Sequence, residues 1–175
     1  KEKGTLKAST NGNKASNHTA AQLLAKSAGF KYKAIPCGGT ADQLLALRQG
    51  EVDVTCAKVA DVAKLVKGDK PELRVLAVFN TKRDPELPNV PTLGEKGLYP
   101  EWYGSARALV APKGTKPEVI QYYVEAFKKT MQDPAVIEAH KKAGMALDFK
   151  DNKELGDLIK AQDKFARDVV NDLYK

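Results

Sequence analysis

The segment YKAIPCGGTA, residues 32–41, passes from a short apolar run through a loop with two glycines into a helical pattern. Further apolar runs lie at residues 6–8, 52–55 and 73–79. They alternate with stretches whose apolar residues recur three and four positions apart, at residues 18–28, 41–49 and 59–67. Strands separated by helices of this length form a mainly parallel sheet with helices on its faces. The first 80 residues therefore predict an α/β fold.

The remainder of the chain has a different pattern. Residues 80–102 are rich in proline and charge, and the apolar run at 107–111 predicts one further strand. Three helices are expected after it, opened by a capping box at residues 115–118, by Asp133-Pro134 and by residues 151–154. The last helix carries an apolar stripe that must be buried against another surface, formed by Leu155, Leu158, Ile159, Phe165, Val169, Val170 and Leu173.

The amino-acid composition and net charge favour some classes of function over others. The 175 residues include 29 basic and 22 acidic side chains, a net charge of +7. The basic residues are scattered and not interleaved with aromatic ones, so the charge indicates a solvated surface that attracts anionic small molecules and argues against nucleic-acid binding. No apolar run approaches the ~20 residues of a membrane-spanning helix, and the first residues lack the apolar stretch of a signal peptide.

Ligand contacts are expected in the loops that follow the strands, because an open parallel sheet binds ligands at the carboxyl ends of its strands. Small hydroxyl, amide and glycine residues followed by a helix N-terminus suit a carboxylate or a phosphate. Plainer interpretations are a helix N-cap at Ser16 or Asn17 and a tight Gly-Gly turn. The predicted ligand-binding residues are Ser9, Thr10, Asn11, Gly12, Asn13, Ser16, Asn17, Gly38, Gly39, Thr40, Cys56 and Ala57.

No pattern of catalytic residues, metal ligands or cofactor binding emerges from the sequence. The two histidines, His18 and His140, have no spacing that links them to a nucleophile or an acid, and His18 is expected to hold its loop. Cys37 and Cys56 match no zinc pattern. They are expected near each other as free thiols, with a disulfide as the alternative.

The chain resembles the extracytoplasmic solute receptors of tripartite tricarboxylate transporters. The resemblance rests on the loop at residues 9–18 and on several motifs that follow it. These motifs are IP at 35–36, GGTA at 38–41, GEVDV at 50–54, LRVLAV at 73–78, Arg83, LP at 87–88, VPT at 90–92, Glu95, Gly97, WYG at 102–104, VAPKGT at 110–115 and Asp133-Pro134.

This resemblance implies a type II periplasmic-binding-protein fold, in which two α/β lobes close over the carboxylate of a small ligand. Residues 4–104 would form the second lobe, with the cleft loops, and residues 105–175 would supply the return strand and helices that complete a partly missing first lobe. It further implies a periplasmic location and no enzymatic activity. The implied partners are a di- or tricarboxylate, an aromatic acid or an amino acid, and the subunits of a membrane transporter.

Two residues depart from the family's pattern. Lys14 stands where glycine or another small residue is common, and Cys37 replaces a polar or charged residue before the glycine pair. The chain matches the later part of the family's sequence, so we expect a fragment or short form that can self-associate through the last helix. A sensor of the same fold that signals to a protein partner is the alternative function.

Overall fold

The computed structural model describes residues 6–145 and 147–174. The chain divides into two compact units, Lys1–Ser105 and Ala106–Lys175. Residues 4 and 5, which open the predicted 4–104 lobe, and residues 146 and 175 of the predicted 105–175 segment lie outside the described ranges. In the described part of the chain, no helix is both long enough and apolar enough to cross a membrane.

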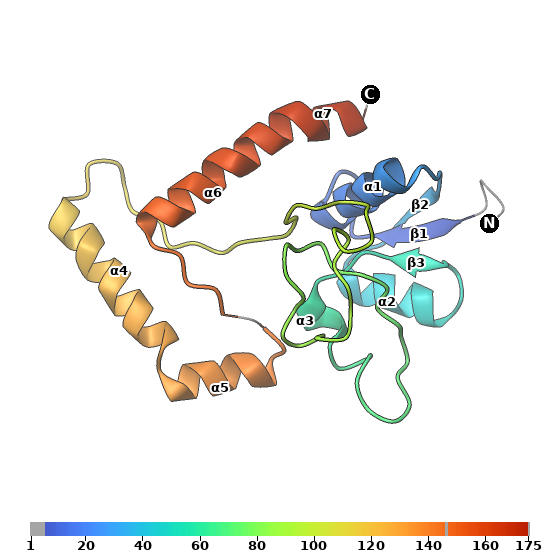
Figure 1. The fold of residues 1–175 in the computed structure, drawn as a ribbon, viewed down its shortest axis with the longest axis horizontal. Helices are drawn as coiled ribbons and strands as arrows, with labels where there is room; N and C mark the ends of the chain where they lie inside the picture. The colour runs from blue at the N-terminus through green and yellow to red at the C-terminus, as the bar shows by residue number, and fades with distance from the viewer. Residues whose placement is uncertain (1–5, 146, 175) are drawn as a thin grey trace. The chain divides into compact units, whose positions relative to one another are not determined.

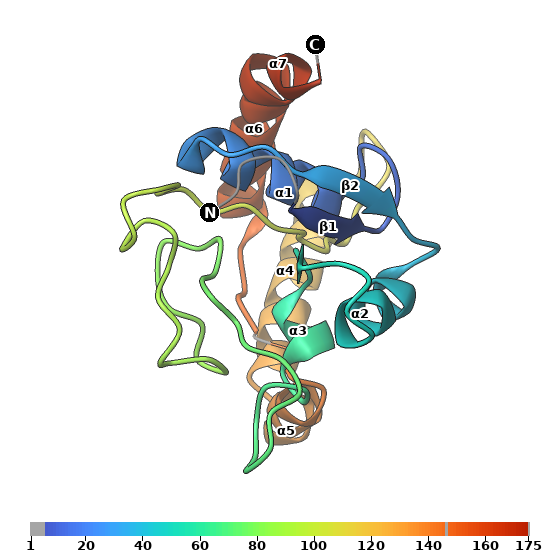
Figure 2. The ribbon, with the colours of Figure 1, turned by 90° about the vertical axis from the view of Figure 1, so that its right-hand side faces the viewer.

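The first unit is built on a three-stranded parallel sheet in the order β2-β1-β3. Strands and helices alternate along the chain as β1 (Lys7–Thr10), α1 (Ser16–Ala28), β2 (Lys33–Pro36), α2 (Thr40–Arg48), β3 (Val54–Thr55) and α3 (Val59–Val62). Right-handed crossovers to opposite sides of β1 place α1 and α2 on opposite faces of the sheet (Figures 1 and 2). The predicted α/β fold is confirmed in this region.

Small and apolar side chains allow the helices to approach the sheet closely. On α1 the buried face includes Ala20, Ala21 and Leu23, and on α2 it includes Leu44 and Ala46. Burying a leucine side chain contributes about 2 kcal/mol, so these contacts outweigh the weak intrinsic preferences of the short strands. Gly29 ends α1 in the left-handed conformation, with φ of 65°.

The strand predicted at residues 73–79 is wrong. Within it, Val78 alone forms a β-bridge, to Thr92, and Leu76 is 59% exposed. An apolar run becomes a strand only beside a neighbouring strand, and the sheet of the first unit ends at β3. The helix predicted at residues 59–67 is likewise reduced to the four residues of α3.

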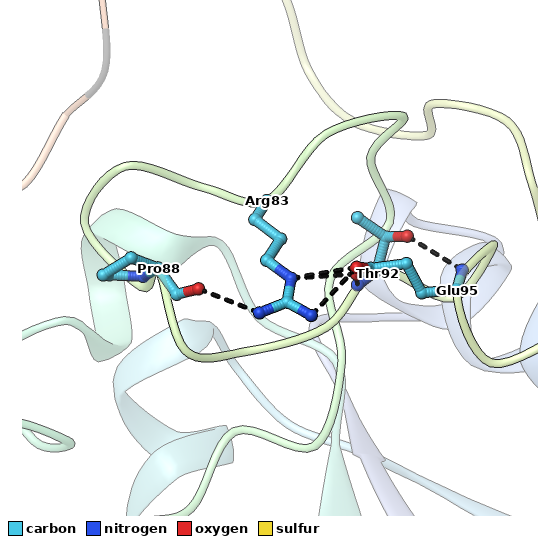
Figure 3. A network of polar contacts seen from close by, with 4 residues as sticks. All are labelled: Arg83, Pro88, Thr92 and Glu95. Carbon is cyan, nitrogen blue, oxygen red and sulfur yellow. Dashed lines mark hydrogen bonds and ion pairs between the residues drawn. The ribbon is translucent and has the colours of Figure 1, made fainter.

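A polar network holds the proline-rich loop that follows (Figure 3). The Arg83 Nε donates to both Glu95 carboxylate oxygens, at 3.0 and 3.1 Å, and Arg83 Nη1 donates to the Pro88 carbonyl at 3.3 Å. Glu95 also accepts from the Thr92 backbone N–H at 2.7 Å. The hydrogen bond from Arg83 is the main cause that lowers the pKa of Glu95. These motif residues therefore have a structural role.

The second unit contains helices α4 (Pro117–Met131), α5 (Pro134–Lys142) and α6 (Asn152–Phe165), then a π-helical turn (Ala166–Val170) and α7 (Asn171–Leu173). As predicted, Asp133 caps α5, by accepting from Ala135 N at 2.8 Å, and residues 151–154 open α6, where Asp151 forms a capping box with Glu154. The predicted capping box at residues 115–118 is wrong. The Thr115 hydroxyl donates to the Pro112 carbonyl, and Lys116 is the N-cap of α4.

The apolar faces of the second unit remain largely uncovered. No described residue of α4, α5 or α6 is buried, and Tyr122, Phe127 and Ile159 are exposed. The strand predicted at residues 107–111 is absent, and Val110 is 91% exposed. A strand there would need a neighbouring strand, and the second unit has none among its described residues. The π-turn also interrupts the apolar stripe of the last helix.

The Arg83 network should limit local opening of the loop. We expect Glu95→Gln to speed limited proteolysis between residues 80 and 98, because an amide loses the charge that Arg83 binds. Cleavage rates measured by mass spectrometry test this expectation, with Glu101→Gln as the control on the same loop. Equal cleavage rates in both variants would show that the network does not hold the loop.

Candidate functional site

The loops after the three strands lie at one edge of the sheet. Parallel pairing sets Thr10 opposite Pro36 and Ser9 opposite Thr55, so the strands end together. The predicted convergence of the strand-end loops is thereby confirmed. We refer to residues 11–17, 37–40 and 56–58 as the rim.

The rim contains a topological switch point. Strand β2 lies on one side of β1 and β3 lies on the other, so the crossovers β1–α1–β2 and β2–α2–β3 run in opposite directions and cover opposite faces of the sheet. In open α/β sheets, ligands bind in the crevice that this divergence creates beyond the strand ends. By this rule, a ligand is expected beyond the ends of the neighbouring strands β1 and β3.

A buried glutamine connects the elements that meet at this point. Gln43 of α2 is 0% exposed, and its Nε2 donates to Ser9 O and Thr55 Oγ1, both at 2.9 Å. Its Oε1 accepts from Asn17 Nδ2 of α1 at 2.8 Å. Our sequence interpretation did not select Gln43. The sequence pattern that could have identified Gln43 is a polar residue on the buried face of α2, three positions before Ala46.

The structure divides the predicted ligand-binding residues into two sets. Ser9 and Thr10 are 0% and 1% exposed, and the Ser9 hydroxyl donates to the Gln43 carbonyl, while Asn17 is also buried. These three lie beneath the rim. The partly or fully exposed members are Asn11, Gly12, Asn13, Ser16, Gly38, Gly39, Thr40, Cys56 and Ala57.

Helix α1 presents its first turn without a side-chain cap. Its N-cap is Ala15, and the first turn contains no acidic residue. The suggested caps at Ser16 and Asn17 are therefore wrong, since both belong to the helix itself. The Ala15 side chain offers no acceptor to the first N–H groups of α1, and a helix start of this kind suits an anion.

Helix α2 also begins without a side-chain cap, but Asp42 lies in its first turn. Thr40 is its first helical residue and not its cap. A Cβ on residue 38 would lie 2.7 Å from Asp42 Oδ2. The Asp42 carboxylate can therefore keep its present position only while residue 38 is glycine. The negative charge makes this helix end less favourable for an anion than the start of α1.

His18 holds the β1–α1 loop, as expected. The Lys14 backbone N–H donates to His18 Nδ1 at 3.0 Å, and Lys14 adopts a left-handed φ of 58°. Glycine adopts that conformation without strain, which explains why a small residue suits this position. Burial lowers the pKa of His18, and an accepting Nδ1 requires the neutral ring.

Two further features border the rim. The Asn11 Oδ1 is buried and has no hydrogen-bond partner among the described residues. Tyr103, packed against Phe79 with ring centroids 6.1 Å apart, donates its hydroxyl to the Ser16 carbonyl at 3.3 Å. An unsatisfied buried acceptor calls for a donor from water or from a ligand.

The cysteines lie on opposite sides of the central strand. Cys37 follows β2 and Cys56 follows β3, so two strand spacings, about 10 Å, separate them. That distance exceeds the ~7 Å limit of a disulfide, and both are free thiols. The expectation that they lie near each other is therefore wrong, because β1 lies between them. Burial raises the pKa of the Cys56 thiol to about 12.

Among the described residues, no group of three or more His, Cys, Asp or Glu side chains could hold a metal ion. A hollow lined by Leu45, Arg48, Gln49 and Glu72 lies at the far end of α2 from the rim.

The family model of the tripartite tricarboxylate transporter family receptor matches residues 1–173. The chain belongs to this receptor family. Among curated relatives, the UPF0065 protein in the gbd 5'region of Cupriavidus necator is 35% identical over 131 residues, which are 75% of this chain and 39% of that protein. Protein BugT of Bordetella pertussis is 31% identical over 123 residues, 70% of this chain and 37% of that protein.

Solved receptors share the fold. A TctC solute binding protein from Polaromonas superposes with a TM-score of 0.84 at 25% identity, over 97% of this chain and 58% of that chain. MatC from Rhodopseudomonas palustris, solved with malate, gives a TM-score of 0.62 at 24% identity, over 79% of this chain and 47% of that chain. An R. palustris protein with adipate gives a TM-score of 0.75 at 22% identity, over 95% of this chain and 56% of that chain. The receptor chain thus spans about half the length of these relatives.

The neutral His18 makes stability depend on pH. The unfolded chain binds a proton at His18 near pH 6.5, whereas the folded chain resists it. Stability is therefore fully present above pH 6.5 and declines as pH falls toward the lower folded-state pKa. We expect His18→Asn, which keeps an acceptor near the Nδ1 position, to reduce this decline in melting temperature between pH 7.5 and 5.5.

His140→Asn, at the other histidine of the chain, is the matched control and should keep the decline. An unchanged decline in His18→Asn would show that His18 is not its source.

Proposed function

We propose that this receptor chain contributes one wall of a periplasmic cleft that binds a small carboxylate and delivers it to a membrane transporter without chemical conversion. The observation that carries this proposal is the start of α1, which has no side-chain cap and no acidic residue in its first turn and lies at the switch point of the sheet. Helix N–H groups and the helix dipole favour an anion there by about 0.3–1 kcal/mol before any other contact is counted.

The groups in and next to the rim support binding in preference to catalysis. His18 accepts from the loop backbone, burial raises the pKa of the Cys56 thiol, and the Ser9 hydroxyl donates to a carbonyl. None of these groups is activated as a base or a nucleophile. The exposed rim offers amide, hydroxyl and backbone groups, which suit a di- or tricarboxylate, an aromatic acid or an amino acid.

We assign residues 4–104 to the second lobe of the receptor and residues 105–175 to the completion of the first. The division of the chain into two units and the greater length of the relatives support this assignment. So do the exposed Leu109 and Val110 on a segment with strand-like sequence. In the longer relatives, the remaining part of the first lobe would cover these apolar faces.

Calorimetry with malate, adipate and citrate tests the proposal on this chain and on the longest product of its gene. The isolated chain leaves a bound carboxylate open to water, where each contact is weak, so we expect about millimolar affinity, or ~4 kcal/mol. The longest product should bind at least one acid with micromolar affinity. Absence of binding to every acid would refute a carboxylate receptor, and micromolar binding by this chain alone would refute the lobe assignment.

An acidic residue at the start of α1 should have opposite effects on carboxylate affinity and on the stability of the helix. Ser16→Asp should stabilise the helix by up to about 1 kcal/mol through its dipole, and it should weaken carboxylate binding at least tenfold by repulsion. Ala135→Asp places the same charge in the first turn of α5, in the second unit, and is the control. Undiminished affinity in Ser16→Asp would place the carboxylate elsewhere.

The uncovered second unit should promote self-association of this chain. Ile159 is 58% exposed on α6, and apolar faces of this kind are normally covered by another surface. We expect concentration-dependent dimers in sedimentation velocity, reduced by Ile159→Glu and retained in Lys160→Glu on the same helix. Monomers at all concentrations would contradict this expectation.

A further inference from the structure

We propose that Gln43 is the positioning residue of the rim. Its amide fixes the ends of β1 and β3 to the start of α1, so ligand affinity depends on a side chain that no ligand touches. Gln43 is fully buried, which excludes direct contact with a ligand at the rim. The inference rests on the proposed function, because it concerns the same binding surface.

The hydrogen bonds permit one orientation of the amide. The Gln43 Nε2 faces oxygen acceptors on both strand ends, with Ser9 O and Thr55 Oγ1 at 2.9 Å and Cys56 O at 3.4 Å. The Thr55 hydroxyl proton is directed to Ser9 O at 3.1 Å, which leaves its oxygen to accept from Gln43. A rotated amide would set its oxygen against two carbonyls and its nitrogen against the Asn17 amide nitrogen.

In this orientation, the Gln43 amide also bonds to the start of α1. Asn17 is the second residue of α1, and it is buried with its Nδ2 directed to Gln43 Oε1. The first turn of the helix, where we place the carboxylate, is therefore tied through one amide to the ends of both β1 and β3. Movement of either strand end would move the N–H groups that face the ligand.

Packing alone does not require glutamine at this position. Methionine has a similar length and would fill the space without the cost of desolvating an amide. A buried polar network whose members are satisfied selects one arrangement of the surrounding elements. The amide thus serves to set geometry at the rim.

Hydrogen exchange of the longest product of the gene tests the geometric part of the proposal. In Gln43→Met we expect at least tenfold faster exchange of the hydrogen-bonded amides of Lys14, Thr19 and Asp53, which lie in the β1–α1 loop, in the first turns of α1 and between β3 and β1. No comparable change is expected where Lys33 N bonds Leu6 O between β2 and β1. Gln49→Met, an exposed glutamine just after the same helix, is the control. Uniform acceleration throughout the first unit would indicate general destabilisation and overturn the proposal.

Calorimetry with malate, adipate and citrate on the same proteins tests the functional part. Gln43→Met should bind at least tenfold more weakly than wild type at a temperature where both are folded. If Gln43→Met does not fold, Thr55→Val removes one branch of the network and should show the same two effects more weakly.

Unchanged rim exchange, or equal affinity in folded variants, would overturn the positioning role. If the wild type binds none of the three acids, the proposed function fails, and the exchange data alone then decide whether Gln43 orders the rim.

Discussion

The side-chain amide of Gln43 bonds the polar groups where the neighbouring parallel strands β1 and β3 stop and α1 begins. At such a junction the backbone leaves the sheet ladder, and its carbonyls lose their regular partners. One Nε2 and one Oε1 connect Ser9 and Thr55 with Asn17, across sequence separations of up to 34 residues. The positions of the rim loops, and hence the access of any ligand to the start of α1, depend on this connection.

The sequence predicted the part of the fold in which each strand has a neighbour close in the chain. Apolar runs and helical spacing located β1, α1, β2, α2 and β3, because their pairing is local and their buried faces are periodic. The runs at 73–79 and 107–111 have the same composition and remain unpaired among the described residues. Composition indicates the capacity to form a strand, whereas a neighbouring strand decides whether it forms.

The sequence predicted which loops form the candidate site, but it did not predict which individual side chains are exposed in it. Parallel strands require their ends to converge, so the rim followed from topology. The solvent exposure of each residue could not be predicted from topology. Ser9 and Thr10 are small hydroxyl residues of the kind found in ligand loops, yet both are buried beneath the rim. Gln43 was missed since sequence periodicity treats a glutamine on an apolar face as an exception, and only coordinates show what it binds.

The enclosed thiol at the end of β3 gives the rim an unequal chemical reactivity. Burial raises the pKa of the Cys56 thiol to about 12, so it stays protonated at neutral pH, whereas the thiolate is the form that reacts with alkylating reagents. Cys37 lies at the opposite end of the rim, across β1. A maleimide fluorophore would therefore attach first at Cys37, so the native chain already contains a position for an optical reporter on the rim.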